Sequence, residues 1–124
     1  MPNHKQALGR RGEQLAAAFL QRRGMEILER NFRIRGGEID LIAKEKDTYV
    51  FVEVKARTTF RYGRGTEAVH LGKQQALLRT AQAYLYRKGL MEAPARFDVI
   101  ELDFSEEIPR LRYLKNVLFE TQPI

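Results

Sequence analysis

The sequence contains 124 residues, which suffices for one domain with a single hydrophobic core. Hydrophobic residues make up 44% of the chain and charged residues 31%, and no apolar run approaches the roughly 20 residues that span a bilayer, so a helical membrane protein is excluded. The lack of cysteine excludes disulfides, thiolate zinc sites and cysteine nucleophiles, whereas the net charge of +6 and the pI near 9.8 suit a polyanionic partner.

The N-terminal segment carries charges where a secretion signal needs an apolar core, so we expect a cytoplasmic protein. Residues 5–23 predict a helix, because apolar side chains recur at helical spacing and Gly24 follows as a stop signal. These side chains are Leu8, Leu15, Ala16, Phe19 and Leu20. Glu13 shares a helical face with apolar residues. It either points inward or is a boundary residue whose carboxylate reaches water.

Three short runs rich in Val, Ile, Phe and Tyr then predict strands at residues 25–34, 39–43 and 49–56. Side chains alternate between the two faces of a strand. In the second strand Glu38, Asp40 and Ile42 therefore fall together, opposite Ile39, Leu41 and Ala43. In the third strand Tyr49, Phe51, Glu53 and Lys55 share one face, opposite Val50, Val52 and Val54.

A hairpin of the second and third strands predicts a metal site. It brings Asp40, Glu53 and Lys55 onto one surface, and charges within apolar strands are costly to retain without a metal or a partner. Carboxylates and waters are ligands for hard cations such as Mg²⁺ or Mn²⁺. We expect Asp40 and Glu53 to be direct ligands, joined by the backbone carbonyl of Val54 and by Glu13, directly or through water.

The segment TTFRYGRGTE, residues 58–67, predicts a basic loop. Arginine can hold phosphate in a bidentate fork, glycine lets the backbone approach closely, and aromatic side chains can stack on bases. We therefore expect Arg57, Arg61 and Arg64 to bind nucleic acid, although an ordinary surface loop has a similar composition.

Residues 69–88 predict a second helix, with an apolar stripe on one side and Gly89 as its stop. No acid lies between Glu67 and Glu92, so the cations of this helix form either a phosphate-facing side or a solvated one. We include Lys73 among the expected nucleic-acid contacts.

The C-terminal part predicts two further strands, at residues 95–104 and 111–119, separated by a turn. The distribution of charge sets this part of the chain apart. Residues 1–35 carry eight Lys or Arg against three acids, residues 36–96 carry eleven against seven, and residues 97–124 carry three against six. We therefore expect the basic surface on the first two thirds of the chain, around the grouped acids.

A basic surface around a few carboxylates suits a metal-dependent enzyme acting on nucleic acid, because phosphates must be attracted while the metal needs acids. Lys55 would orient or deprotonate the attacking water, or stabilise the transition state electrostatically. The sequence leaves these roles of the lysine open.

The order of elements and the placement of the charges resemble the PD-(D/E)xK nuclease superfamily. The matching pieces are Glu13 in RRGEQLAAAFL, Asp40 in GGEIDLIA, and Glu53-Val54-Lys55 in FVEVKAR. More narrowly, nearly the whole chain resembles the YraN-like uncharacterised protein family of bacteria, which is related to archaeal Holliday junction resolvases. Ile39 stands where the superfamily's name places a proline. The Q-x-x-x-Y helix motif of the exonuclease branches is also absent, and Lys73, Gln74 or Gln75 would replace it.

This resemblance implies one domain over residues 1–124 with a restriction-endonuclease-like α/β fold, in which helices flank a central mixed sheet in the order α-β-β-β-α-β-β. It also implies a Mg²⁺- or Mn²⁺-dependent DNA endonuclease. As far as the likeness to junction resolvases extends, it implies selectivity for branched DNA and a homodimer. The alternative is a nucleic-acid-binding or DNA-repair accessory protein that keeps the fold without turnover, because a fold does not fix a function. A protein-interaction subunit is a third reading.

Overall fold

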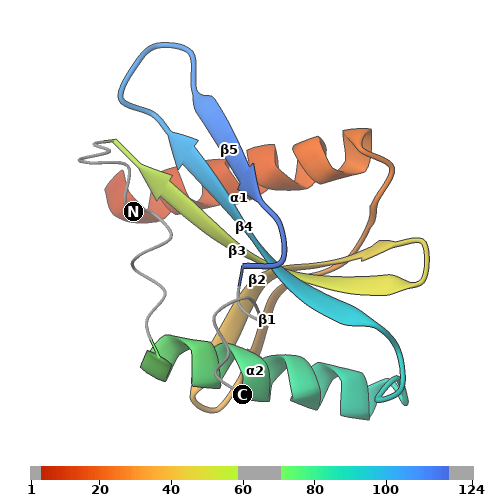
Figure 1. Ribbon diagram of the computed structural model, residues 1–124. Helices are drawn as coiled ribbons and strands as arrows, with labels where there is room; N and C mark the ends of the chain where they lie inside the picture. The colour runs from red at the N-terminus through yellow and green to blue at the C-terminus, as the bar shows by residue number, and fades with distance from the viewer. Residues whose placement is uncertain (1–3, 59–70, 118–124) are drawn as a thin grey trace.

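The computed structural model describes residues 4–58 and 71–117. In this part of the chain, helices and strands follow one another in the predicted order (Figure 1). They are α1 (His4–Arg22), β1 (Glu26–Ile34), β2 (Gly37–Glu45), β3 (Thr48–Arg57), α2 (Leu71–Arg87), β4 (Ala95–Asp103) and β5 (Arg110–Leu114). The α/β class and the element order are confirmed, and the arrangement is consistent with a restriction-endonuclease-like fold.

Both helices end where glycine was predicted to stop them. Gly24 follows α1 with φ 91° and Gly89 follows α2 with φ 69°, a left-handed conformation that glycine adopts without steric cost. The next residue in each case donates its N–H to a carbonyl five residues back, Met25 to Leu20 at 3.1 Å and Leu90 to Leu85 at 2.7 Å. This bond satisfies a carbonyl of the last helical turn and fixes the direction of the strand or turn that follows.

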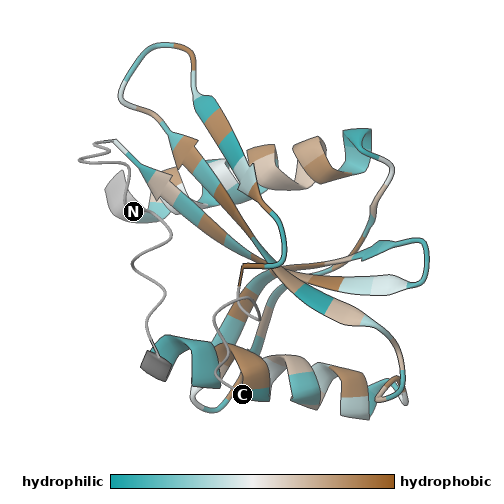
Figure 2. Ribbon diagram, in the orientation of Figure 1, coloured by the Kyte–Doolittle hydropathy of each residue, from teal (hydrophilic) through white to brown (hydrophobic). Residues whose placement is uncertain are grey.

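The five strands form one mixed sheet in the spatial order β1-β2-β3-β4-β5. The pairs β1–β2, β2–β3 and β4–β5 are antiparallel, whereas β3 and β4 are parallel. A parallel pair needs a crossover connection, and α2 lies within it. Hydrophobic and hydrophilic residues alternate along the strands, most visibly along β5 (Figure 2).

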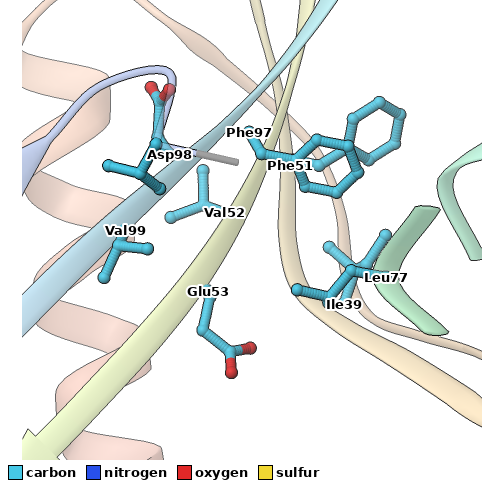
Figure 3. A pocket seen from close by; sticks show the side chains of 9 residues that line it. Ile39, Phe51, Val52, Glu53, Leu77, Phe97, Asp98 and Val99 are labelled. Atoms are coloured by element: carbon cyan, nitrogen blue, oxygen red, sulfur yellow. The ribbon is translucent and has the colours of Figure 1, made fainter. Parts of the chain in front are cut away.

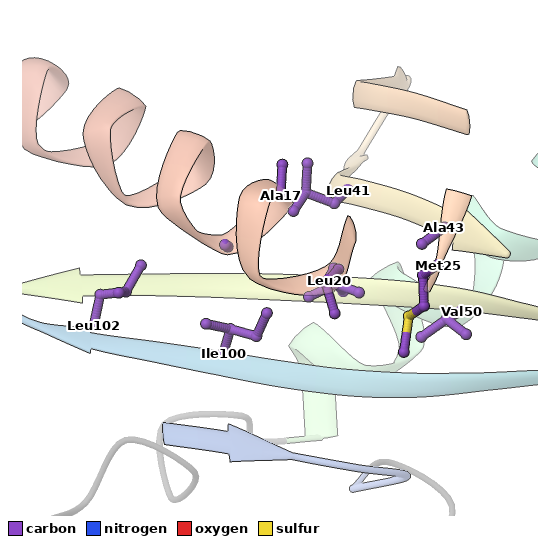
Figure 4. Close-up of a cluster of buried hydrophobic side chains, with 10 residues drawn as sticks. Ala17, Leu20, Met25, Leu41, Ala43, Val50, Ile100 and Leu102 are labelled. Carbon is purple, nitrogen blue, oxygen red and sulfur yellow. The ribbon is translucent and has the colours of Figure 1, made fainter. Parts of the chain in front are cut away.

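The sheet buries an apolar cluster on each face, one under each helix. Figure 4 shows the α1-side cluster between that helix and the strands. Its buried residues are Ala16, Ala17, Leu20, Met25, Leu41, Ala43, Val50, Val52, Ile100 and Leu102. The α2-side cluster consists of Ile39, Ile42, Tyr49, Phe51, Leu77, Ala81, Tyr84, Leu85 and Phe97. The side chains of β3 alternate between these clusters as predicted, which places Glu53 and Lys55 on the α2 side.

Alternation fails at one predicted position, Ile39. This residue packs in the α2-side cluster instead of lying opposite Asp40 and Ile42. The β1–β2 pairing keeps one register on both sides of this point, with Arg30 opposite Leu41 and Phe32 opposite Ile39, but Asn31 between them has φ 54°. The register shift between these strands lies farther along, between Ile27 and Glu29. A left-handed residue interrupts the regular pleat, and asparagine tolerates that conformation better than most residues.

The last two strands are shorter than predicted. β4 ends at Asp103, one residue early, and β5 spans Arg110–Leu114 where residues 111–119 were expected. Asn116 has φ 55° and donates its N–H to Asp98, so the chain has left strand geometry there. Residues 118–119, residues 69–70 of the second predicted helix, and residues 59–67 of the basic loop lie outside the described part.

Candidate functional site

The site forms where β2 and β3 separate. Their ladder runs from Glu45 opposite Thr48 to Leu41 opposite Val52. One residue beyond that last pair, the Asp40 carboxylate accepts a hydrogen bond from the Val54 N–H at 2.8 Å. A side chain thus satisfies a backbone donor that has lost its strand partner, and this bond draws Asp40 toward the strand that carries Glu53.

Asp40 and Glu53 form a carboxyl pair. Burial and the neighbouring charge of Glu53 together raise the pKa of Asp40 from 3.8 to about 8, while the Val54 N–H acts in the opposite direction. A hydrogen bond between the two side chains also favours the protonated form of Asp40. Asp40 therefore holds its proton at neutral pH, beside the Glu53 carboxylate that pairs with Lys73. A divalent cation in place of that proton would allow both to be charged.

Two lysines border this pair. Lys73 comes from the first turns of α2 and forms an ion pair with Glu53, with side chains that are 43% and 11% exposed. Lys55 lies two residues after Glu53 on the same face and is buried. Burial lowers the pKa of Lys55, and the charge of Lys73 lowers it further, whereas Glu53 acts in the opposite direction.

The carboxyl pair opens into a cavity of about 380 Å³ between the sheet and α2. Its lining residues are Glu38, Asp40, Glu53, Val54, Lys73, Ala76 and Leu77. Behind it lies a small apolar pocket, where Glu53 points away from Phe51 and Phe97 (Figure 3). The carboxylate of Asp98 points in the opposite direction (Figure 3).

Glu13 reaches the neighbourhood of the site from α1. Partial burial raises its pKa, a hydrogen bond from Asn31 opposes that shift, and the charge of Glu38 adds to it. The charge of Glu13 in turn contributes to the raised pKa of Asp40. The acid predicted on the first helix is therefore electrostatically coupled to the carboxyl pair, although it does not line the cavity.

The predicted site residues thus fall into distinct positions. Asp40 and Glu53 are paired, Lys55 shares their side of the sheet, and Lys73 contacts Glu53. Arg57 ends β3 on the same side by alternation. Arg61 and Arg64 lie outside the described residues. Within residues 4–58 and 71–117, no three His, Cys, Asp or Glu side chains are gathered closely enough to hold a metal ion as they stand.

The donor set nevertheless suits a hard cation. Asp40 and Glu53 would provide oxygen ligands from neighbouring strands, and Mg²⁺ is commonly held by one or two carboxylates together with waters and substrate phosphates. The raised pKa of Asp40 means that the described cations offset only part of the negative charge that Asp40 and Glu53 would carry together. The residues present therefore fit a metal bound mainly by two carboxylates, with Glu13 in an outer position.

Sequence reasoning missed a buried polar network on the α1 side. Asp98 is buried on β4 and accepts hydrogen bonds from Arg96 Nε at 3.1 Å, Tyr113 Oη at 2.5 Å and the Asn116 N–H at 2.9 Å. Arg96 also bonds to Glu45 at 2.9 Å. These bonds lie within β4 or join it to β2, β5 and the segment after β5, so this network fixes structure.

Comparison with known proteins gives the family of the chain. Residues 12–102 match the family described as "Uncharacterised protein family UPF0102". A UPF0102 protein of Geobacter metallireducens is 45% identical over 116 residues, which cover 94% of this chain and 95% of that protein. A UPF0102 protein of Geobacter sulfurreducens is 47% identical, with 92% and 90% coverage. One from Chlorobium chlorochromatii is 52% identical, with 80% and 76% coverage.

Proposed function

This chain belongs to the uncharacterised protein family UPF0102, and we propose that it is a Mg²⁺- or Mn²⁺-dependent DNA endonuclease that hydrolyses phosphodiester bonds. The observation that carries the proposal is the carboxyl pair of Asp40 and Glu53, held at the point where β2 and β3 separate with Lys55 on the same side. This placement agrees with the resemblance of GGEIDLIA and FVEVKAR to the PD-(D/E)xK motif.

Asp40 and Glu53 would hold the metal, with the Val54 carbonyl and Glu13 as the further ligands proposed from the sequence. When bound, the metal supplies an activated water and neutralises charge on the phosphoryl oxygens. Lys73 now neutralises Glu53. With a cation in that role, the exposed ammonium of Lys73 becomes available to a substrate phosphate. Arg57, at the end of β3, is a further phosphate contact proposed from the sequence.

Lys55 acts on the attacking water or on the developing negative charge. Its burial and lowered pKa favour proton transfer, because a lysine that holds its proton less tightly gives a better general base. Its charge favours stabilisation of the transition state. Lys55→Arg separates the two roles, since arginine keeps the charge and does not accept a proton at ordinary pH.

The proposal is tested by cleavage of labelled single-stranded, duplex, flap and four-way junction DNA with Mg²⁺ or Mn²⁺. Asp40→Asn and Glu53→Gln should each reduce cleavage by about 10²-fold or more, because each removes a charged ligand. Asp47→Asn is the matched control, since Asp47 is exposed in the turn between β2 and β3. Equal cleavage by the wild type and Asp40→Asn would refute the nuclease assignment. The junction substrate tests the proposed selectivity, and sedimentation tests the proposed homodimer.

The alternative function is a DNA-binding accessory protein without turnover. Two observations favour it. Among the described residues no three acids lie close enough to hold a metal ion, and Lys73 already neutralises Glu53. It predicts salt-dependent DNA binding with no cleavage of any substrate in the panel.

A further inference from the structure

The strand register defines a polar surface on the α2 side of the sheet, beyond the helix. Phe51 lies opposite Phe97 and both pack in the α2-side cluster. Further along these strands, Lys55 lies opposite Glu101, which lies opposite Arg112 on β5. In the next row on this side, Arg57 lies opposite Asp103, which lies opposite Arg110. We call Lys55, Arg57, Arg110 and Arg112 the cationic face.

Arg112 is anchored by a buried acid. The Glu101 side chain is 2% exposed, and its Oε1 forms an ion pair with Arg112 Nε at 3.2 Å. Among the described residues, Glu101 Oε2 has no hydrogen-bond partner. Because this bond uses Nε, the two terminal amino groups of Arg112 remain as the part of the fork that recognises phosphate. Its side chain is 52% exposed, so the guanidinium faces solvent while its counter-charge lies beneath it.

Arg110 is held more loosely. Its side chain is 74% exposed, and it pairs with Glu106, which is also exposed. Such a surface pair contributes little stability and exchanges readily for another anion. A cavity of about 400 Å³ opens between these arginines and β4, lined by Glu101, Asp103, Arg110, Leu111 and Arg112.

We propose that the cationic face binds the sugar-phosphate backbone of DNA on one side of the Asp40–Glu53 pair. The inference rests on the proposed function, and it assigns to that site a continuous DNA strand instead of a small phosphate ester. The two rows carry these four cations against two acids, Glu101 and Asp103, and the buried Lys55 makes the face continuous with the candidate site. The sequence had favoured the opposite, since residues 97–124 carry more acids than cations.

The dimensions of the sheet set the length of DNA engaged. Strands rise about 3.3 Å per residue and lie about 4.8 Å apart. Arg110 on β5 is therefore roughly 16 Å from Glu53, four residues along the strand direction and two strands across. A DNA strand advances about 3.4 Å per nucleotide, so the face spans about five nucleotides beyond the cleaved bond.

The test measures DNA binding by the full chain in EDTA. Binding is monitored by the fluorescence anisotropy of labelled 20-nucleotide single strands, duplexes and four-way junctions over a range of salt concentrations. Glu101→Gln with Arg112→Gln leaves the net charge unchanged and removes both members of the ion pair, so that neither is left without the other. Loss of one phosphate contact should lower the slope of log K against log salt by about 0.9 on duplex DNA. Arg110→Ala should lower it by a similar amount.

The matched control is Arg87→Ala with Lys88→Ala at the other end of α2, about 21 Å along the helix from Lys73. This variant loses two charges and should keep the wild-type slope. The proposal would be overturned if the double variant of Glu101 and Arg112 kept the wild-type slope, or if the control lowered the slope equally. It would also be overturned if the wild type did not bind DNA. Cleavage is measured separately. If DNA binding depends on the cationic face but no DNA is cleaved, the nuclease proposal is refuted and the proposed role of the face is supported. If DNA is cleaved but the salt slope of the variants is unchanged, the nuclease proposal is supported and the role of the face is refuted.

Discussion

Replacement of Asp40 by asparagine should stabilise the metal-free protein. Asparagine has nearly the same shape, its oxygen can accept the Val54 N–H, and its amino group can donate to Glu53. It removes only the ionisable proton. The wild-type carboxyl is held protonated by burial and by the charge of Glu53, with its pKa raised to about 8, and that restraint opposes folding.

The sign and the size follow from proton linkage. An acid with a folded-state pKa above its unfolded-state value holds its proton more tightly when folded, so the folded state loses stability as pH rises from about 4 to about 8. Each pKa unit corresponds to about 1.4 kcal/mol, which puts the upper limit near 6 kcal/mol. Water entry and movement of Lys73 relieve part of this cost. We expect Asp40→Asn to gain on the order of 2 kcal/mol at pH 8 and almost nothing at pH 4.

The assay is urea and thermal unfolding at several pH values with EDTA, using Asp47→Asn as the control. A gain of this size raises the midpoint by about 8 °C in a domain of this length. Adding Mg²⁺ or Mn²⁺ at about 100 times Kd should stabilise the wild type by about 2.7 kcal/mol and leave Asp40→Asn unchanged. The reasoning is refuted if Asp40→Asn unfolds at the same midpoint as the wild type at pH 8, or if Asp47→Asn gains as much.

The remaining predictions concern stability and are measured by urea unfolding. Asp98→Asn should cost about 3 kcal/mol, because it leaves the partly buried Arg96 guanidinium without its carboxylate on β4; a loss below 1 kcal/mol would contradict the structural role of this network. Gly37→Ala should destabilise by about 1–3 kcal/mol, because an added Cβ would lie 2.0 Å from Thr80 Oγ1 and 3.1 Å from a backbone carbonyl of α2. At Gly9 an added Cβ would have no atom within 4 Å, so Gly9→Ala should instead stabilise α1 by about 0.5–1 kcal/mol. If both substitutions changed the free energy of unfolding in the same direction, the packing of α2 on β2 would be contradicted.

Local patterns account for what could be predicted about the fold. Helical spacing in residues 5–23 and the glycines at 24 and 89 place the helix ends to within a residue or two where the structure describes them. The two-residue period of β3 put Glu53 and Lys55 on one side. These features depend on neighbours in the chain, so no knowledge of distant partners was needed.

Non-local pairing accounts for what could not be predicted. Ile39 was assigned to the wrong side, because the alternation along β2 changes next to the left-handed Asn31 of the neighbouring strand. Partners of Asp98 come from β5 and the segment after it, so the sequence of β4 alone does not reveal the network. The signal for both lay in residues distant along the chain.

The sequence by itself determined the order of the elements, the stops of the helices and the side of β3 that carries the acid and the lysine, because backbone geometry and side-chain periodicity are local. Only the tertiary structure decided that the Val54 N–H holds Asp40 beside Glu53, that α2 brings Lys73 to the Glu53 carboxylate, and that Glu101 lies between Lys55 and Arg112. The register between strands and the seating of a helix on a sheet are set by packing over the whole core, which no single stretch of sequence encodes.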